Sequence, residues 1–195
     1  MSPRPRKVTD DDLFMAAQRA MSRLGPGELT LADIAAEAGV TAGLLVQRFG
    51  SKRELLLALS KRFSGGTGEM FAQLRSGHRS PLATLRAYSG CMASLASSPA
   101  ALARNFAYLQ IDLTDPDFRR HLAKQALATR NELRKLIREA VAAGELVPGT
   151  NASQLARTVE AIVSGSMMSW AFYRKGPAAK WMRHDLDAIL KPYLT

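Results

Sequence analysis

Side chains with the chemistry to read a nucleic acid lie together in one short stretch of the sequence. The amide of Gln47 suits the edge of an adenine, and the guanidinium of Arg48 suits a guanine edge or a phosphate. Ala42 and Leu44 are apolar groups of the kind that contact thymine methyl groups, and Gly43 between them would permit a close approach to DNA. This chemistry is available only if the local fold turns these side chains away from the protein core.

A short helix is predicted immediately before this stretch, over residues 31–38. Thr30 is suited to be its N-cap, and Asp33 follows three residues later, where its carboxylate can complete a capping box. Apolar residues recur at i, i+3, i+4 and i+7 and define one buried face. Gly39 follows at the point where the helix must end in a left-handed residue. A tight turn is therefore expected directly after Gly39.

The stretch itself is predicted to be the second helix of a helix-turn-helix. Thr41 can cap it, Gly50 can end it, and Leu45 and Phe49 form an i, i+4 pair on one face. With about 100° of rotation per residue, placing that pair inward leaves four residues outward: Gly43, Leu44, Gln47 and Arg48. Such a helix is the one that helix-turn-helix proteins place in the major groove. A small αα-hairpin within an ordinary helical bundle is the alternative, because glycine turns between helices are common.

Residues 9–58 resemble the N-terminal domain of the tetracycline-repressor-like (TetR) family of bacterial transcription regulators. The resemblance rests on the order and spacing of four segments: Leu24-Gly25, TLADIA at residues 30–35, AGVTAG at residues 38–43 and FGSKRELL at residues 49–56. Two positions depart from the pattern. The family usually has a tyrosine where this chain has Val46, and a tyrosine or histidine where it has Arg48. The DNA contacts must therefore be read from this sequence itself.

The resemblance implies a homodimeric, sequence-specific DNA-binding regulator, with the expected role of a repressor that a small-molecule effector releases from a palindromic operator. Lys52 matches a family contact to the DNA backbone, and it lies at the positive end of its helix. The predicted DNA-contacting residues are Thr30, Thr41, Ala42, Gly43, Leu44, Gln47, Arg48 and Lys52. The alternative is a helical small-molecule-binding protein or an enzyme that does not act on DNA.

The charge of the chain favours an anionic partner without identifying it. The formal net charge is +10, of which residues 1–63 contribute +3 and residues 64–195 contribute +7. Most of the excess thus lies outside the helix-turn-helix. Residues 1–8 are expected to form a basic arm, whose Arg4 and Arg6 either reach phosphates and a minor groove or belong to a solvated tail without function.

Cysteine usage and hydropathy predict a soluble, cytoplasmic protein without a membrane partner. The single cysteine, Cys91, allows no intramolecular disulfide and fits a reducing compartment, as a buried inert thiol rather than a redox sensor. No apolar run follows the basic N-terminus, so a signal peptide is not expected. The longest uncharged stretch, residues 161–173, is shorter than the ~20 residues that span a bilayer.

The rest of the chain reads as helical, because helix start signals recur and alternating strand patterns do not. Asn151 or Ser153 can open one late helix. Three earlier helices are marked by a capping side chain before a proline at the first helical position: Ser80-Pro81, Ser98-Pro99 and Asp115-Pro116. The expected fold is all-α with about nine helices. It comprises the arm (1–8), a three-helix helix-turn-helix domain (9–63) and a helical effector-binding and dimerisation bundle (64–195).

The last two long helices are expected to form the dimer interface, as the resemblance implies. Their candidate interface residues are Val159, Ile162, Val163, Met167, Trp170, Leu186, Ile189 and Leu190. Small residues beside them would let another helix approach closely: Ala161, Ser164, Gly165 and Ser166. The alternative is that these apolar residues simply close the core of one chain.

The middle helices are expected to surround an effector pocket. Its candidate lining residues are Met70, Phe71, Leu74, Tyr88, Met92, Arg104, Phe106, Tyr108, Phe118 and His121. The alternative assigns the apolar members to plain core, and Arg104 and His121 to helix surfaces. A basic run between Arg119 and Arg138 is read as a solvated face, with an anionic effector such as an acyl-CoA as the other possibility.

No catalytic set is expected from the sequence. His78, His121 and His184 lack metal-ligand spacing with one another, and neither a phosphate-cradling glycine loop nor a nucleophile elbow is present. We therefore predict a protein that is not an enzyme and that uses no metal or cofactor.

Overall fold

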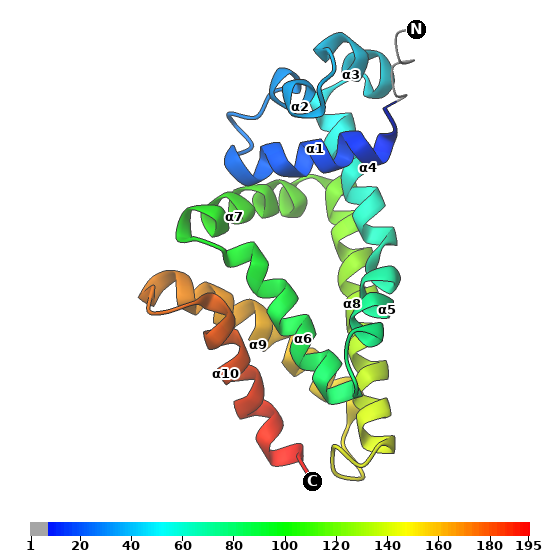
Figure 1. The fold of residues 1–195 in the computed structure, drawn as a ribbon, viewed down its shortest axis with the longest axis vertical. Coiled ribbons are helices and arrows are strands. Elements are labelled where there is room, and N and C mark those ends of the chain that lie inside the picture. Colours follow the sequence, from blue (N-terminus) through cyan, green and yellow to red (C-terminus); the bar gives the residue numbers. More distant parts are fainter. Residues whose placement is uncertain (1–7) are drawn as a thin grey trace, which may run out of the picture. The chain divides into compact units, whose positions relative to one another are not determined.

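The computed structural model describes residues 8–195, which form ten α-helices and two short 3₁₀ turns without a β-strand (Figure 1). The predicted all-α class is confirmed. Within this range the helices number ten where about nine were expected, and only Gly66 separates α4 from α5. The helices are α1 (Asp10–Arg23), α2 (Leu31–Ala38), α3 (Ala42–Phe49), α4 (Lys52–Gly65), α5 (Thr67–Ser76), α6 (Pro81–Ala93), α7 (Pro99–Thr114), α8 (Pro116–Ala142), α9 (Ala152–Tyr173) and α10 (Ala178–Leu190), and the 3₁₀ turns are η1 (Ser94–Ala96) and η2 (Lys191–Tyr193). None of these helices has the length and apolar character needed to cross a bilayer.

The chain divides into two compact units. Unit 1 contains the chain up to Arg62 together with residues 103–119, and unit 2 contains residues 63–102 and 120–195. The division after Arg62 lies next to the predicted boundary at residue 63. Sequence reasoning missed residues 103–119, which comprise most of α7 and the first turn of α8 and belong to the same unit as the helix-turn-helix. This segment is distant along the chain, so no local pattern marks it as part of unit 1.

The helix starts of unit 1 are fixed by local side-chain caps. Thr9 and Thr30 each accept a hydrogen bond from the backbone N–H three residues later, and Asp12 and Asp33 return the bond to the cap. Hydrogen bonds from the side chain and backbone of Thr30 hold the pKa of Asp33 below its usual value. Burial acts in the opposite direction but is the smaller effect. The predicted capping box of α2 is therefore confirmed.

A compact apolar core holds the first four helices of unit 1 together. Leu13, Ile34, Leu45 and Leu55 are fully buried and come from α1, α2, α3 and α4 respectively. Each buried side chain of this size stabilises the fold by about 1.5–3 kcal/mol relative to an exposed one. The core thus fixes the direction in which the opposite face of α3 points.

Ion pairs clamp the outer edge of α1 to the end of α2. Glu37 on α2 accepts from Arg19 Nε at 2.7 Å and from Arg23 Nη2 at 2.7 Å. The hydrogen bond from Arg19 and the charge of Arg23 hold the pKa of Glu37 below its usual range. The first helix is therefore attached to the helix-turn-helix by charge as well as by packing.

Residues 103–119 are attached to unit 1 by polar contacts. The Tyr108 hydroxyl donates to the Leu24 carbonyl at 3.0 Å, and burial raises the pKa of Tyr108 to about 12. Arg53 at the start of α4 donates to both carboxylate oxygens of Asp115, at 2.9 and 2.7 Å from Nη2, and to Asp117 at 2.8 Å. Its guanidinium also lies 5.7 Å from the centroid of the buried Phe118 ring.

The predicted start signals later in the chain are confirmed. Ser80 and Ser98 accept from the backbone N–H three residues on, at 3.2 and 3.1 Å, ahead of prolines at the first position of α6 and α7. Asp115 caps α8 by accepting from the Asp117 N–H at 2.9 Å. Asn151, rather than Ser153, caps α9, because its Oδ1 accepts from the Gln154 N–H at 3.1 Å.

Unit 2 is built around an apolar core to which α5, α6, α8, α9 and α10 contribute. Phe71 and Tyr88 stack at its centre with ring centroids 5.3 Å apart. Arg75 on α5 pairs with Glu132 on α8 at 2.8 Å, and Arg86 on α6 pairs with Asp187 on α10 at 2.7 Å. The helices of unit 2 are therefore joined by charge pairs around a continuous core.

Candidate functional site

One face of α3 packs against the core of unit 1. Leu45 is fully buried, and the half-buried Phe49 ring lies 5.8 Å from the Phe14 ring on α1, centroid to centroid. Gly50 ends the helix with a φ of 84°, a conformation that glycine adopts without strain. The predicted inward pair of α3 is confirmed, so the opposite face of this helix is turned to solvent.

The exposed face of α3 carries the predicted readers of base edges. Gln47 and Gly43 are exposed, and Ala42 and Leu44 are half-buried. The Gln47 amide makes no hydrogen bond to any residue between 8 and 195, so both of its polar atoms are available to a ligand. A Cβ at Gly43 would meet only Thr41 Oγ1, at 3.9 Å, and the backbone there is consequently open to close approach.

Arg48 is on the exposed face, but its guanidinium is already engaged. Its Nε lies 2.6 Å from Asp10 Oδ1, and its Nη1 donates to the Val8 carbonyl at 2.8 Å. Asp10 is the first residue of α1, and Val8 lies two residues before it. Sequence reasoning placed Arg48 outward and missed these partners, which are about 40 residues away along the chain.

The two capping threonines differ in what their hydroxyl groups can still do. Thr30 Oγ1 donates its proton to Asp33 at 2.6 Å while accepting from the Asp33 N–H, so its donor capacity is used within the cap. Thr41 Oγ1 accepts from the Leu44 N–H at 3.2 Å and keeps its proton free in the described structure. Of the two, Thr41 is the one that can donate to a phosphate without breaking its cap.

Lys52 is less available than its position in the sequence suggests. Its Nζ donates to the Pro26 carbonyl at 3.1 Å and to the Leu29 carbonyl at 2.7 Å. An ammonium group has three donors, so one remains for another acceptor. The side chain therefore ties the start of α4 to the loop between α1 and α2, whatever else it binds.

One exposed residue of α3 was not predicted as a contact. Val46 has 49% of its surface accessible to solvent, and it adjoins Gln47 at the place where the family pattern has an aromatic residue. Its apolar side chain is suited to a thymine methyl group. The predicted arm residues Arg4 and Arg6 lie outside the residues that the structure describes.

Most of the predicted dimer-interface residues are buried within their own chain. Val159, Val163, Trp170, Leu186 and Leu190 have at most 6% of their surface exposed and pack inside unit 2, whereas Ile162, Met167 and Ile189 are half-buried. The five buried side chains have almost no surface to offer a partner, which favours the alternative that they close the core of one chain. The small residue Ser166 is buried as well, and its hydroxyl donates to Asp185 on α10 at 2.5 Å.

The exposed face of α9 is a different stripe of residues. Met168 and Phe172 have 47% and 73% of their surface accessible, and the small residues Ala161 and Gly165 precede them at helical spacing on the same face. A Cβ added to Gly165 would meet no atom of its own chain within 4 Å. This stripe is both apolar and open to a close helix–helix approach.

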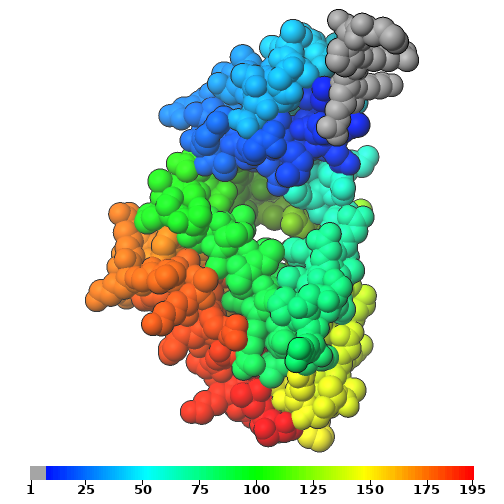
Figure 2. Space-filling model, in the orientation of Figure 1, coloured from blue at the N-terminus to red at the C-terminus, as the bar shows by residue number. Residues whose placement is uncertain are grey.

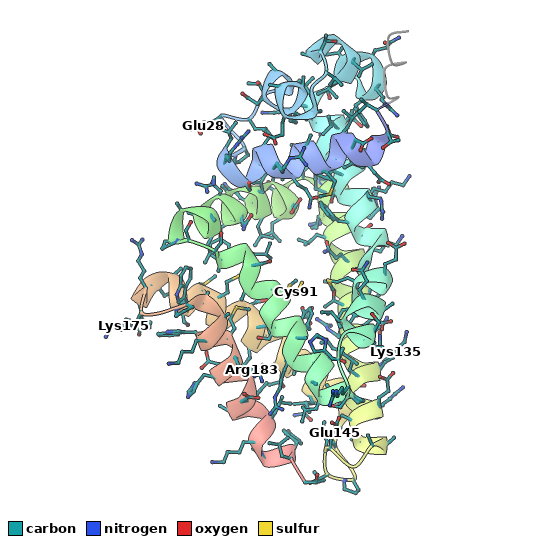
Figure 3. All side chains as sticks on the ribbon, in the orientation of Figure 1. Glu28, Cys91, Lys135, Glu145, Lys175 and Arg183 are labelled. Atoms are coloured by element: carbon teal, nitrogen blue, oxygen red, sulfur yellow. The ribbon has the colours of Figure 1, made fainter. Side chains whose placement is uncertain are left out.

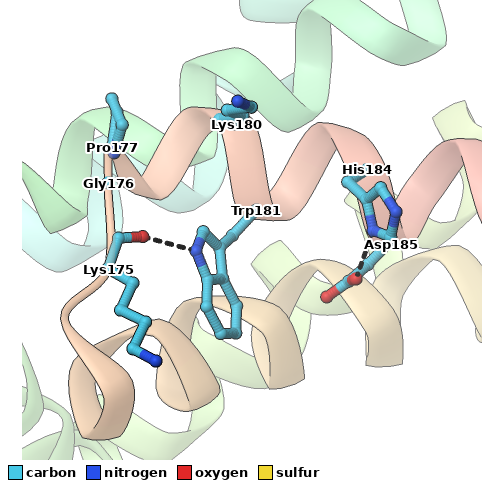
Figure 4. A pocket seen from close by; sticks show the side chains of 7 residues that line it. All are labelled: Lys175, Gly176, Pro177, Lys180, Trp181, His184 and Asp185. Atoms are coloured by element: carbon cyan, nitrogen blue, oxygen red, sulfur yellow. Dashed lines mark hydrogen bonds and ion pairs between the residues drawn. The ribbon is translucent and has the colours of Figure 1, made fainter.

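A groove lies at the connection between α9 and α10, and no sequence signal pointed to it. It has a volume of about 610 Å³ and is lined by Lys175, Gly176, Pro177, Lys180, Trp181, His184 and Asp185 (Figure 4). The Trp181 indole donates to the Lys175 carbonyl at 2.6 Å and stacks on Tyr173, with centroids 5.6 Å apart. Lys175 projects at the surface in Figure 3, and the same corner, in orange, is open to solvent in Figure 2.

The candidate effector-binding residues are divided between the two units. Arg104, Phe106, Tyr108 and Phe118 lie in unit 1, and Met70, Phe71, Leu74, Tyr88, Met92 and His121 lie in unit 2. Tyr108 and Phe118 are buried in the core of unit 1, and the Arg104 Nε donates to the Ser22 carbonyl at 2.8 Å. Phe71 and Tyr88 form the centre of the unit 2 core, and Met70, Leu74 and Met92 pack against it. These contacts favour the plain-core alternative for most of the set.

The basic run of α8 is partly neutralised by neighbouring acids. Arg130 pairs with Glu160 on α9 at 2.7 Å, and Lys135 pairs with Glu132 at 2.6 Å. Arg119, Lys124 and Arg138 are exposed. This arrangement favours the solvated-face reading of the run.

Two family models match the chain. One is described as "Bacterial regulatory proteins, tetR family" and matches residues 13–59, and the other is described as "Tetracyclin repressor-like, C-terminal domain" and matches residues 106–186. Together they cover roughly two thirds of the sequence. No curated protein matches the chain by sequence.

Solved structures share the fold over nearly the whole chain. A TetR transcription regulator from Haloarcula marismortui is 17% identical, with 95% of this chain and 98% of that chain covered and a TM-score of 0.74. SmeT, the repressor of the Stenotrophomonas maltophilia multidrug efflux pump SmeDEF, is 21% identical, with 97% and 92% covered and a TM-score of 0.67. The regulator FadR from Bacillus subtilis, solved in complex with stearoyl-CoA, is 17% identical, with 93% and 97% covered and a TM-score of 0.69. Because both sequence models agree with the all-α fold and the helix-turn-helix, this chain belongs to the TetR family of bacterial transcription regulators.

Proposed function

We propose that this protein is a sequence-specific DNA-binding repressor that acts in the cytoplasm and leaves a palindromic operator when a small-molecule effector binds. The observation that carries the proposal is the exposed face of α3. Gln47 has no partner among residues 8–195 and lies near the open backbone of Gly43, while Leu45 and Phe49 pack the opposite face of the helix into the core. A rigid helix that presents an amide without a partner is suited to read base edges.

In the bound state, α3 would lie in the major groove with its exposed face toward the bases. Gln47 would bind an adenine, Arg48 a guanine or a phosphate, and Ala42, Leu44 and Val46 thymine methyl groups. Thr41 would donate its free hydroxyl proton to a phosphate, and the remaining donor of Lys52 would do the same. The contacts to bases would select the DNA sequence, and the contacts to phosphates would set the register of the protein on the duplex.

A palindromic operator requires two copies of α3, so we propose a homodimer. The exposed stripe of α9, which comprises Ala161, Gly165, Met168 and Phe172, is the surface that supports this proposal best. The groove beside Trp181 adjoins the end of α9 and would belong to the same interface. Apolar and aromatic side chains of this kind are enriched in the centres of protein–protein interfaces.

An effector would bind to the helical part of the chain that follows the helix-turn-helix. FadR, which has the same fold, was solved with stearoyl-CoA, and this supports a pocket for a small molecule in this architecture without indicating which molecule this chain binds. The Arg53 contacts with Asp115 and Asp117 join the start of α4 to the start of α8 within unit 1. A shift of α8 would consequently be passed to the helix that follows α3.

Duplex binding by Gln47→Ala tests the base-reading role. The wild-type chain is expected to enrich a duplex from a random library, and the substitution should weaken binding to that duplex by ~1–3 kcal/mol while leaving a scrambled duplex nearly unaffected. Gln125→Ala on the exposed surface of α8 serves as the control and should change neither affinity. Equal losses on both duplexes would contradict the assignment of Gln47 to a base.

A further inference from the structure

Three consecutive carboxylates at the start of α1 have three different partners. Asp12 is used by the Thr9 cap, and Asp11 pairs with Arg62 on α4 at 3.2 Å. Asp10 forms an ion pair with Arg48 of α3 at 2.6 Å. The helix start needs only the capping carboxylate, so the pairing of Asp10 with Arg48 is not explained by the local structure of α1.

The contacts of Arg48 leave one edge of its guanidinium free. A guanidinium has five N–H donors. Nη1 donates to the Val8 carbonyl, and Nε forms an ion pair with Asp10 at 2.6 Å, so three donors on Nη1 and Nη2 have no partner among the described residues. The side chain nevertheless remains accessible, with 33% of its surface exposed. The group is thus held at one end and open at the other.

We propose that Asp10 is a positioning residue that sets the DNA specificity of Arg48, an inference that rests on the proposed DNA-binding function. The ion pair with Asp10 keeps the guanidinium close to the start of α1 and restricts its movement, while the terminal amino groups keep donors for a ligand. These two groups are the ones that bind guanine N7 and O6 together. Asp10 itself remains on α1 and does not contact the base.

The same pair limits binding to the wrong sequences. Phosphates occur along every duplex and attract an untethered arginine whatever the sequence is. The carboxylate of Asp10 offsets the charge of Arg48 and restricts its orientations, so fewer phosphates come within reach. A guanine in the correct place is still reached by the free edge. Asp10 therefore lowers the contribution of Arg48 to non-specific binding more than its contribution to specific binding.

The test compares Asp10→Ala with Asp11→Ala, which removes the same charge from the next position of the same helix. Each variant is titrated against the duplex that the wild-type chain enriches from a random library and against a scrambled duplex of the same composition. Asp10→Ala should lower the ratio of the two affinities about fivefold, on the scale of an exposed ion pair, and should steepen the salt dependence on the scrambled duplex. Asp11→Ala should raise both affinities equally and leave the ratio unchanged.

Two further measurements separate positioning from a loss of structure. In the Arg48→Ala background, Asp10→Ala should no longer change the ratio, because the residue it positions is absent. In the wild-type chain, the Arg48 Nε proton should exchange with solvent more slowly than in Asp10→Ala. Equal changes on both duplexes, or equal exchange rates, would overturn the positioning role and leave the proposed function standing. A wild-type chain that prefers no duplex would overturn both.

Discussion

Asp112 and Asp115, near the α7–α8 junction, have pKa values that their surroundings shift in opposite directions. Asp115 accepts hydrogen bonds from Arg53, and these hold the pKa of Asp115 below its ordinary value. Asp112 is half-buried and has no partner among the described residues, so burial raises the pKa of Asp112. The ionised form is therefore stabilised at one position and destabilised at the other.

This contrast predicts opposite effects of the same substitution at neutral pH. Asp115→Asn should lower the free energy of unfolding, and Asp112→Asn should raise it. The stabilisation from Asp115 is present above the ordinary carboxylate pKa and is lost as the pH falls through its depressed folded-state value. The penalty at Asp112 is present above its raised pKa and disappears as the pH falls through that value. Urea unfolding between pH 7 and pH 3 measures both, and effects of the same sign at pH 7 would contradict the account.

Individual roles could be predicted where the partner is near in sequence. The caps at Thr30, Thr41 and Ser80 have their partners three residues away and were predictable from spacing alone, whereas spacing left Asn151 and Ser153 as alternatives for α9. The Asp10 partner of Arg48 was not predictable, because only the packed tertiary structure brings α1 to the end of α3. The type of a residue thus indicates the chemistry of its side chain, but not which distant residues of the same chain it contacts.

At the scale of the element, the first turn of α4 supports the loop between α1 and α2. Lys52 provides two charged hydrogen bonds to carbonyls of that loop, at Pro26 and Leu29. Hydrogen bonds to charged groups contribute more to stability than neutral ones, and a buried carbonyl that loses its donor is costly. This makes Lys52 a structural residue of the helix-turn-helix as well as a proposed phosphate contact.

Lys52→Ala should accordingly reduce the free energy of unfolding by about 1.5–3 kcal/mol. Lys124→Ala, which removes an exposed lysine of α8, is the matched control and should change it little. Urea denaturation followed by circular dichroism provides the comparison. If Lys52→Ala unfolded like the wild-type chain but bound every duplex more weakly, its contribution would be confined to phosphate binding.

Helical periodicity predicted the apolar faces of α9 and α10 but not what covers them. Val159 and Leu186 lie on faces that the core of the same chain buries completely. Met168 and Phe172, on the neighbouring face of α9, remain exposed. A sequence pattern identifies an apolar stripe on a helix. It does not show whether that stripe packs against the same chain or against a second copy.

At the scale of the whole molecule, the proposed dimer depends on the exposed stripe of α9. Gly165→Arg should shift the protein to a monomer in sedimentation equilibrium, because the new side chain occupies the space that a partner helix needs. Gly90→Arg on α6 is the control, since that glycine is also exposed and a Cβ there likewise meets no atom within 4 Å. A Gly165→Arg protein that stays dimeric would place the interface elsewhere.

The central claim is that two copies of α3 read two halves of one operator. Selection of bound duplexes from a random DNA library by the full-length protein tests it most directly. The account predicts enrichment of an inverted repeat whose half-sites are centred about one helical turn, or a multiple of it, apart. Enrichment of a single unpaired site, or of no sequence at all, would contradict it.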